Sequence, residues 1–254
     1  MATHPAETMP DVQPFRAWRY NPDQVGDLAD VIAPPYDVID AAEQLELYQR
    51  HPCNIVRLIL NRAEPGDSGD LERYHRAAGF LQQWQQQGVL VRDPEPAVTV
   101  YHQQVGRGES SIVRRGFLAR VRLEELGTGS IYPHEQTMPG PKADRLALWQ
   151  HCRTCLSPIF GLHSASATDV QEPFEAACRD TVPVEVTDRN GVLHRMWPVN
   201  DREVIAGVTA ALADAEVFIA DGHHRYETAL ACRDAAAAGG SLDHDHPARF
   251  TLMM

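Results

Sequence analysis

The sequence predicts a mixed α/β fold in which a curved mixed sheet is flanked by helices. Short apolar runs rich in branched residues, typical of strands, alternate with stretches whose apolar residues recur every three or four positions, typical of amphipathic helices. Two segments also carry hairpin signals, a Gly-Arg-Gly turn at residues 106–108 and an Asn-Gly pair at Asn190 and Gly191. Together these patterns point to a mixed α+β architecture.

The first half of the chain opens with a turn-rich segment over residues 12–40, where Pro34 and Pro35 fix an extended backbone. Asp40 can cap the helix that follows, and Gly88 can end an amphipathic helix. The elements expected here are a helix at residues 41–50, a strand at 55–60, a helix at 71–87 and hairpin strands at 97–105 and 111–121.

The second half continues the alternation of strands and helices. Gly239 and Gly240 stop the last helix, and residues 250–254 form an apolar strand that ends without a turn, a polar tail or a partner. We therefore expect that a C-terminal part of the protein is missing from this chain. The other elements expected are a helix through Trp149 and Cys152, a strand at 158–163, a helix at 169–180, a hairpin at 184–199, a helix at 201–213, a strand at 217–220 and a helix at 226–238.

The length of 254 residues allows one large domain or two closely packed lobes. We expect residues 1–11 to be a flexible tail and residues 12–254 to form a single domain. Two lobes, at about 12–125 and 126–254, are the alternative.

The composition narrows the class of partner. With 35 acidic and 23 basic residues, the net charge of -12 opposes binding to nucleic acid, whereas a small phosphate ligand needs only a few local donors. No apolar run approaches the roughly 20 residues of a membrane helix, and no signal peptide is visible. Five scattered cysteines without such a signal indicate reduced thiols and a cytoplasmic location.

One segment combines a buried strand, a glycine turn and a helix start, which is the outline of an anion site. Gly222 would let a phosphate approach the backbone, and the amides at the helix N-terminus carry a partial positive charge. Arg225, His223 and His224 add donors, and Asp221 could take a proton from a hydroxyl or hold a metal ion. The alternative is that Asp221 only caps the helix while both histidines are solvated.

Two other polar segments could contribute to the same site. Tyr36 and Asp37 could place a hydroxyl and a carboxylate at a pocket rim, with a rigid turn as the alternative. The loop over residues 133–145 combines a proton carrier, carboxylates and basic side chains that suit a doubly negative substrate, although solvated loops have a similar composition. Its candidate residues are His134, Glu135, Thr137, Lys142 and Arg145.

These segments resemble, in order, the motifs of the domain-of-unknown-function family numbered one thousand and fifteen. The resemblance covers residues 12–254, and it implies that family members extend beyond the last residue of this chain. The motifs are Val-Ile-Ala-Pro-Pro-Tyr-Asp-Val at residues 31–38, Pro-His-Glu-Gln-Thr at 133–137 followed by Lys142, Asp144 and Arg145, and Asp-Gly-His-His-Arg at 221–225.

The last motif is further similar to the turn that holds the transferred phosphate in free-serine kinases of the ParB and sulfiredoxin superfamily. This similarity implies a ParB/sulfiredoxin-like element and a phosphotransferase that moves phosphate from pyrophosphate or a nucleotide to L-serine or another small, amino-acid-like hydroxyl acceptor. Magnesium is expected with such a donor. No Gly-Lys-Ser/Thr loop is present, which favours pyrophosphate.

The resemblance also implies roles for the candidate residues. Either Asp221 or Glu135 would be the general base. The resemblance implies neither a set of metal ligands nor an oligomeric state. A nonenzymatic sensor of a phosphorylated metabolite or nucleotide, and a phosphohydrolase, are the alternative functions. The catalytic group would be Asp221, His223, His224 and Glu135, the phosphate-binding group Gly222, His223, His224 and Arg225, and the substrate-binding group Tyr36, Asp37, His134, Thr137, Lys142 and Arg145.

Overall fold

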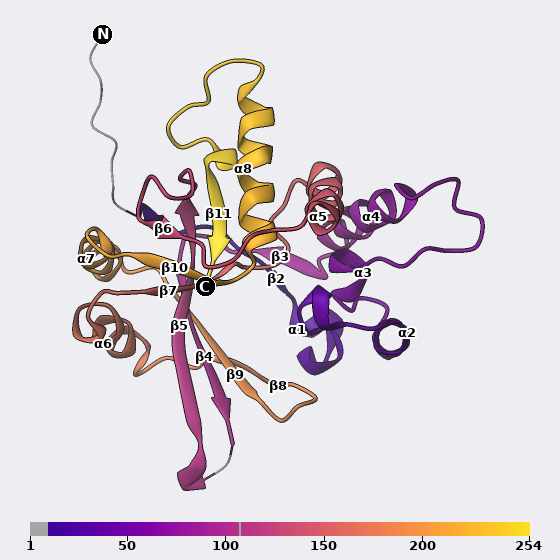
Figure 1. The fold of residues 1–254 in the computed structure, drawn as a ribbon. Coiled ribbons are helices and arrows are strands. Elements are labelled where there is room, and N and C mark those ends of the chain that lie inside the picture. The colour runs from indigo at the N-terminus through magenta and orange to yellow at the C-terminus, as the bar shows by residue number, and fades with distance from the viewer. Residues whose placement is uncertain (1–9, 107) are drawn as a thin grey trace.

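The computed structural model describes residues 10–106 and 108–254 and confirms the predicted mixed α/β class. Residues 1–9 of the predicted tail lie outside the described residues. The largest sheet has six strands, whose neighbours all pair antiparallel (Figure 1). In sheet order its strands are β1 (Val12–Gln13), β5 (Ile112–Arg122), β4 (Val98–Val105), β9 (Leu193–Val199) and β8 (Val184–Thr187), and β11 (Phe250–Met253) also pairs with β5.

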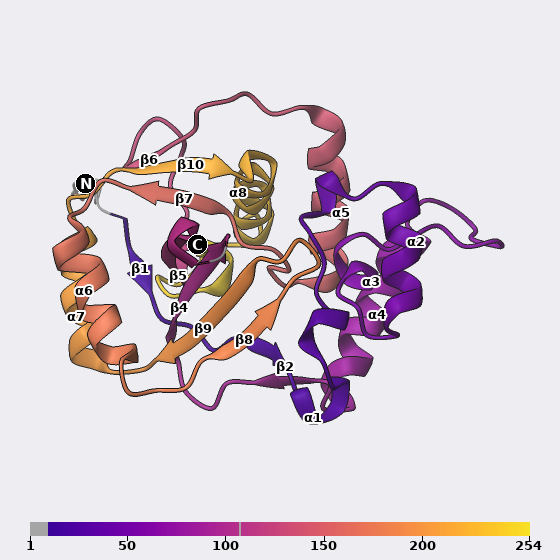
Figure 2. The same ribbon diagram turned by 90° about the horizontal axis from the view of Figure 1, so that it is seen from below.

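A second sheet contains the strand that leads into the Asp-Gly-His-His-Arg turn. Its central strand, β10 (Val217–Asp221), runs parallel to β6 (Ile131–Tyr132) and antiparallel to β7 (Phe160–His163). Figure 2 shows these three strands side by side. Ile159, just before β7, bridges to Met253 of β11, so the two sheets are joined through their backbones. A short third sheet pairs β2 (Trp18–Tyr20) with β3 (Leu90–Arg92).

The α-helices of the described residues are α1 (Pro22–Val25), α2 (Ala41–Arg50), α3 (Val56–Ile59), α4 (Glu72–Gln86), α5 (Pro139–Cys152), α6 (Ala167–Cys178), α7 (Arg202–Leu212) and α8 (His223–Ala237). Figures 1 and 2 show α6 and α7 together at one side of the sheets and α2 to α5 at the other. The last helix, α8, packs against α5. In the part of the chain that the structure describes, none of these helices has the length and apolar character needed to cross a bilayer.

Buried apolar residues form two large clusters, one beside α6 and α7 and the other among α3, α4 and α5. The main cluster lies between the sheets and α6 and α7, and includes Phe174 and Ile219. The second cluster is built by α3, α4 and α5 around Leu58 and Trp84. Ile219 on β10 and Tyr226 on α8 are both 0% exposed. Because these two residues flank the turn and cannot move without disturbing a close-packed core, the turn is held at both ends.

Most predicted elements are present within a few residues of their expected bounds. The helix predicted at 41–50 matches α2, and both predicted hairpins form. The strand predicted at 55–60 is wrong, because this segment contains the helical turn α3. Buried Asn54 accepts a hydrogen bond from the amide of Val56 and so starts a helix in an apolar run that sequence patterns cannot distinguish from a strand.

Two further expectations need correction. The last helix was predicted to begin at about residue 226, but α8 begins at His223, because the polar residues after Gly222 take up helical conformation without adding an apolar period. The strand at residues 250–254 was expected to lack a partner, but β11 pairs antiparallel with β5 from Phe250 to Met253. The division into lobes stays a prediction.

Candidate active site at the start of α8

The turn between β10 and α8 depends on Gly222. Its φ is +95°, in the left-handed region, and a Cβ built on it would lie 2.9 Å from Cζ of Arg225. Gly222 is also the N-cap position of α8, and no side chain among the described residues caps this helix. By contrast, Asp201 accepts hydrogen bonds from two amides at the start of α7. The first amides of α8 are therefore open donors at the positive end of a helix of 15 residues.

His223 is the most buried polar residue of the turn, with its side chain 2% exposed. Its Nε2 accepts a hydrogen bond from the amide of His134, with N···N 3.3 Å, which places the ring proton of a neutral His223 on Nδ1. Nδ1 lies 3.0 Å from Oε1 of Glu135, although the two groups are not aligned as a hydrogen bond. Burial lowers the pKa of His223 and outweighs the opposite effect of Glu135. His223 is therefore a neutral imidazole at pH 7.

Contacts between His134 and His223 hold the loop that contains His134 against the turn. Their rings meet edge to face, with centroids 4.5 Å apart. Nδ1 of His134 also donates to the carbonyl oxygen of Ile219, at 2.6 Å. As a result Glu135, whose side chain is 55% exposed, is held at the edge of the turn with one face open to solvent.

A second set of contacts joins the same loop and α5 to the outer face of α8. Nε2 of His224 accepts a hydrogen bond from the amide of Met138, at 3.0 Å, just before α5 begins. Nζ of Lys142 lies 2.7 Å from Oε2 of Glu227. Burial opposes ionisation of Glu227, but hydrogen bonds from Lys142 and Thr137 prevail and lower its pKa. Thr137 of the loop and Lys142 therefore converge on α8. Lys142 was expected in a loop over residues 133–145, but it lies on α5, which begins at Pro139.

Arg225 closes the turn on the other side. Its guanidinium pairs with the carboxylate of Asp221 and donates to the carbonyl oxygen of Pro158. The Arg225 side chain is 14% exposed, whereas that of Asp221 is 51% exposed. Asp221 therefore orients Arg225 and does not cap the helix, so the capping alternative does not describe this turn.

Arg145 and Tyr36 form a neighbouring group. Cζ of Arg145 lies 3.8 Å from the centre of the Tyr36 ring, and Nη1 donates to the carbonyl oxygen of Ile59, at 2.8 Å. Burial raises the pKa of Asp144, but Arg145 and the hydroxyl of Tyr74 outweigh it and hold that pKa below its usual range. Arg145 thus links α5 to α3 through the carbonyl of Ile59, and the neighbouring Asp144 links α5 to Tyr74 of α4.

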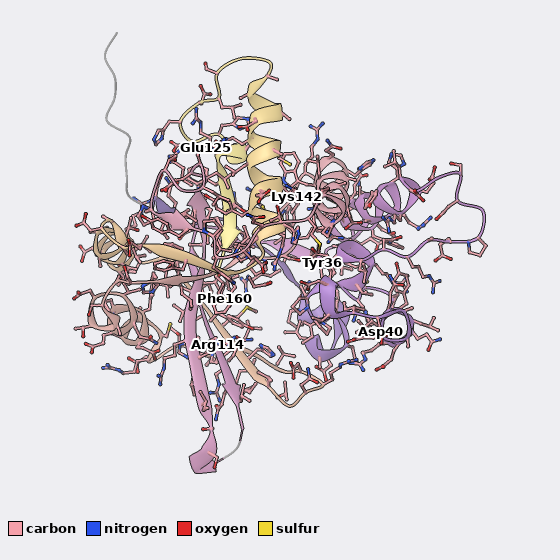
Figure 3. All side chains as sticks on the ribbon, in the orientation of Figure 1. Tyr36, Asp40, Arg114, Glu125, Lys142 and Phe160 are labelled. Atoms are coloured by element: carbon pink, nitrogen blue, oxygen red, sulfur yellow. The ribbon has the colours of Figure 1, made fainter. Side chains whose placement is uncertain are left out.

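The candidate residues from all three motifs therefore lie in one region, but not all of them are in contact with the turn. Burial raises the pKa of Tyr36, while the positive charges of Arg145 and Arg225 oppose the rise, so Tyr36 lies within electrostatic reach of the turn. Figure 3 shows Lys142 beside α8 and Tyr36 near its first turn. Asp37, in a 3-10 turn over Tyr36–Val38, is exposed and makes no hydrogen bond or ion pair with any other described residue. Its predicted substrate contact stays a prediction.

Sequence reasoning missed two groups at this site. Glu227 is the partner of Lys142, and the carbonyl of Pro158 is the acceptor for Arg225. The spacing of Glu227, four residues after His223 on the same helix, is a signal that could have identified it, because residues at that spacing share a face. The Pro158 contact has no local signal, since it depends on β7 lying beside β10.

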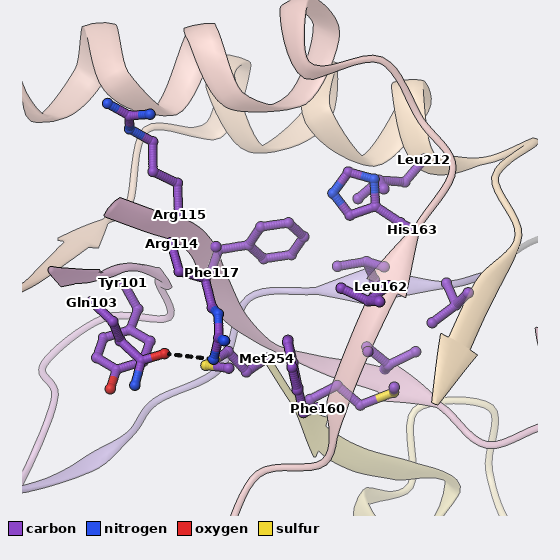
Figure 4. Close-up of a pocket in the computed structure, with 16 residues that line it drawn as sticks. Tyr101, Gln103, Arg114, Arg115, Phe117, Phe160, Leu162, His163, Leu212 and Met254 are labelled. Carbon is purple, nitrogen blue, oxygen red and sulfur yellow. Dashed lines mark hydrogen bonds between the residues drawn. The ribbon is translucent and has the colours of Figure 1, made fainter. Parts of the chain in front are cut away.

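The turn adjoins a small cavity of about 60 Å³ between Arg145 and Arg225. Thr228 lines this cavity, is 6% exposed, and its Oγ1 has no hydrogen-bond partner among the described residues. An unpartnered buried hydroxyl is unfavourable unless a ligand or water contacts it. A larger cavity, of about 230 Å³, lies elsewhere, against β5 and β7 (Figure 4).

A magnesium ion fits this site only as part of a complex with a phosphate donor. Across the described ranges 10–106 and 108–254, no group of three or more His, Cys, Asp or Glu residues is arranged to hold a metal ion. Magnesium is commonly held by one or two carboxylates together with substrate phosphates. Glu135 and Asp221, both about half exposed, are the carboxylates that could share it with phosphate oxygens.

The comparison with protein families identifies one family for this chain. The model of the family described as "Protein of unknown function (DUF1015)" matches residues 12–254, which include every candidate residue described above. No curated protein and no solved structure matches the chain. Because the match covers nearly the whole sequence, the chain belongs to the family described as "Protein of unknown function (DUF1015)".

Proposed function

We propose that the protein is a phosphotransferase, similar to a free L-serine kinase, that moves a phosphoryl group from pyrophosphate or a nucleotide to a small hydroxyl acceptor. The observation that carries the proposal is the uncapped N-terminus of α8 at Gly222, with Arg225 held beside it. Helix N-termini with open amides are effective phosphate sites because they combine hydrogen-bond donors with the positive end of the helix dipole.

In this proposal the transferred phosphate lies against the amides of residues 223–225. His224 supports the placement because its Nε2 is already an acceptor for the amide of Met138, so a neutral ring presents an Nδ1 proton to a phosphate oxygen. Arg225 stays oriented by Asp221, and its positive charge stabilises the transition state. Magnesium, when bound with the donor, would neutralise further phosphate charge.

Glu135 is the proposed general base. Asp221 is engaged with Arg225, whereas Glu135 is 55% exposed and lies beside the neutral His223. The acceptor hydroxyl gives its proton to Glu135 as its oxygen bonds to phosphorus, and the bond from phosphorus to the leaving phosphate or nucleotide oxygen breaks. The cavity between Arg145 and Arg225 is the proposed binding site for the acceptor, whose polar groups would form a hydrogen bond with the hydroxyl of Thr228.

The test is phosphate transfer to free L-serine. Purified protein is incubated with magnesium, L-serine and pyrophosphate, ADP or ATP in turn, and O-phosphoserine is measured by mass spectrometry. We expect product with one donor, and a loss of about 10² to 10⁴ in kcat for Glu135→Gln, the range for loss of a general base. Glu125→Gln, which changes an exposed carboxylate paired with Arg233 away from the turn, is the control that should retain full activity.

Two other outcomes would replace the proposal. Release of phosphate from the donor at the same rate with and without serine would identify a phosphohydrolase. Binding of pyrophosphate or a nucleotide without any turnover would identify a sensor. Equal activity of Glu135→Gln and the unmodified protein would remove Glu135 from the role of base.

A further inference from the structure

A cavity larger than the one beside the turn lies apart from it and has a different character. It has a volume of about 230 Å³ and lies between β5 and β7, with α7 and β11 contributing to its walls. Figure 4 shows Phe117, Leu162 and Leu212 toward one end and Phe160 with Met254 along another side. None of the residues that line it is an aspartate or a glutamate, although the chain as a whole has a net charge of -12. The walls are therefore mainly apolar and carry no negative side chain.

One end of the cavity is polar. Nη1 of Arg114 donates to Oε1 of Gln103, at 3.3 Å, and Cζ of Arg114 lies 5.3 Å from the centre of the Phe160 ring (Figure 4). Arg115 extends away from this end and pairs with Glu175, at 3.4 Å. Arg114, by contrast, pairs with no carboxylate of the described part of the chain. A guanidinium beside an apolar cavity thus keeps most of its donors for another acceptor.

We propose that this cavity binds a small organic acid whose aromatic or branched apolar body fills the cavity and whose carboxylate pairs with Arg114. The size supports such a ligand, since an apolar cavity of about 150 Å³ is enough to hold benzene. A cavity of about 230 Å³ has room for a ring and a short chain that ends in a carboxylate. The charge supports it as well, because a guanidinium binds a carboxylate through two parallel hydrogen bonds.

Gly116 provides a way to block the cavity. It lies in the wall of this cavity and of a neighbouring one of about 90 Å³, and a Cβ built on it would meet no atom within 4 Å. Its φ is outside the left-handed region, so a larger residue is compatible with the backbone of β5. Gly116→Leu is therefore expected to occupy the space without breaking the strand.

The experiment measures binding by isothermal titration calorimetry with two probes of equal shape, 3-phenylpropionate and its uncharged analogue 3-phenylpropanamide. We expect the acid to bind one site and to bind at least about tenfold more tightly than the amide, because only the acid forms charge-assisted hydrogen bonds. Arg114→Gln should remove that difference while leaving the affinity for the amide unchanged. Arg195→Gln, on neighbouring β9 and paired with Glu185 outside the cavity, is the matched control.

Equal affinity for the acid and the amide, or unchanged binding of the acid to Arg114→Gln, would overturn the proposal. So would the absence of binding by both probes at millimolar concentration. Gly116→Leu should bind neither probe, and full binding by a folded Gly116→Leu protein would place the site elsewhere. If that variant does not fold, the two probes and Arg114→Gln still decide the question. Because the readout is binding, it is independent of phosphate transfer.

Discussion

At the scale of single residues, Gly222 is the position on which the proposed site depends most. Gly222→Ala should lower the free energy of unfolding by about 1–2 kcal/mol, because alanine is disfavoured at a φ of +95°. Its Cβ would also displace the Arg225 guanidinium from Asp221, so pyrophosphate binding should fall with it. Chemical denaturation and calorimetric titration measure the two effects.

Gly79→Ala is the matched control for this substitution. Gly79 lies inside α4, is exposed, and a Cβ there would meet no atom within 4 Å. Alanine should therefore raise the free energy of unfolding by about 0.5–1 kcal/mol, since it loses less conformational entropy than glycine in a helix. If Gly222→Ala left the free energy of unfolding unchanged, or raised it as Gly79→Ala does, that result would contradict the geometry described for the turn.

His223 gives a prediction for the dependence of stability on pH. Burial lowers its pKa below 6.5, so the unfolded chain binds a proton at this residue before the folded protein does. Stability should be unaffected by His223 well above pH 6.5 and should fall as the pH drops below that value toward the lower pKa of the folded state. His223→Gln should lessen the fall between pH 7.5 and 5.5 in urea unfolding. An identical pH dependence in the variant would show that His223 is not held neutral.

The residue scale also shows what local sequence can and cannot predict. Asp221, Gly222 and Arg225 could be identified because a polar turn after a buried strand is a local pattern. The contact of Arg225 with the carbonyl of Pro158 could not, since Pro158 reaches the turn only through the pairing of β10 with β7. The sequence predicted that the motif loops converge, but not that Asp221 would orient Arg225.

At the scale of elements, Arg145 and the adjacent Asp144 anchor α5 to α3 and α4. Arg145→Ala should lower the free energy of unfolding by about 1–3 kcal/mol, because it removes the donor to the carbonyl of Ile59, a buried residue, while Asp144 keeps Tyr74 and Arg73 as partners. Arg50→Ala, which breaks an exposed pair with Glu46 on α2, should cost no more than about 0.5 kcal/mol. Similar small losses in both variants, measured in guanidinium chloride, would show that the anchor contributes nothing.

The elements that were predicted correctly share a strong local signal. The predicted 71–87 helix has an apolar period over 15 residues, and the Asn-Gly turn at Asn190 fixes the β8–β9 hairpin. The helical turn α3 is only four residues long and is apolar except for Arg57. Its helical form is set by buried Asn54, which also donates to the carbonyl oxygens of Asp30 and Ile32, and contacts this distant in the chain leave no periodic pattern.

At the scale of the whole molecule, the site depends on the main core because β10 carries the turn. Ile219→Ala should lower the free energy of unfolding by about 3 kcal/mol, since Ile219 is 0% exposed within the main cluster. Ile219→Val should cost only about 1 kcal/mol. We also expect folded Ile219→Ala protein to bind phosphate more weakly, because β10 carries the turn. A loss below about 1 kcal/mol for Ile219→Ala would mean that β10 is not packed as described.

The strand order could not be predicted from the sequence. Local patterns identified individual strands and hairpins, but β11 pairs with β5 more than 120 residues earlier in the chain, and β7 bridges to it through Ile159. Such long-range pairings are decided by how the apolar faces fit together in three dimensions, and this fit is not encoded in any short segment.

The most direct test of the central claim, that the start of α8 holds the phosphate of the donor, is an amide NMR titration of the protein with pyrophosphate and magnesium. We predict large shifts for the amides of His223, His224 and Arg225, which no side chain of residues 10–106 or 108–254 caps. The amides of Glu203 and Val204 at the start of α7, already bonded to Asp201, should not shift. Shifts centred on another region, or none at millimolar pyrophosphate, would contradict the claim.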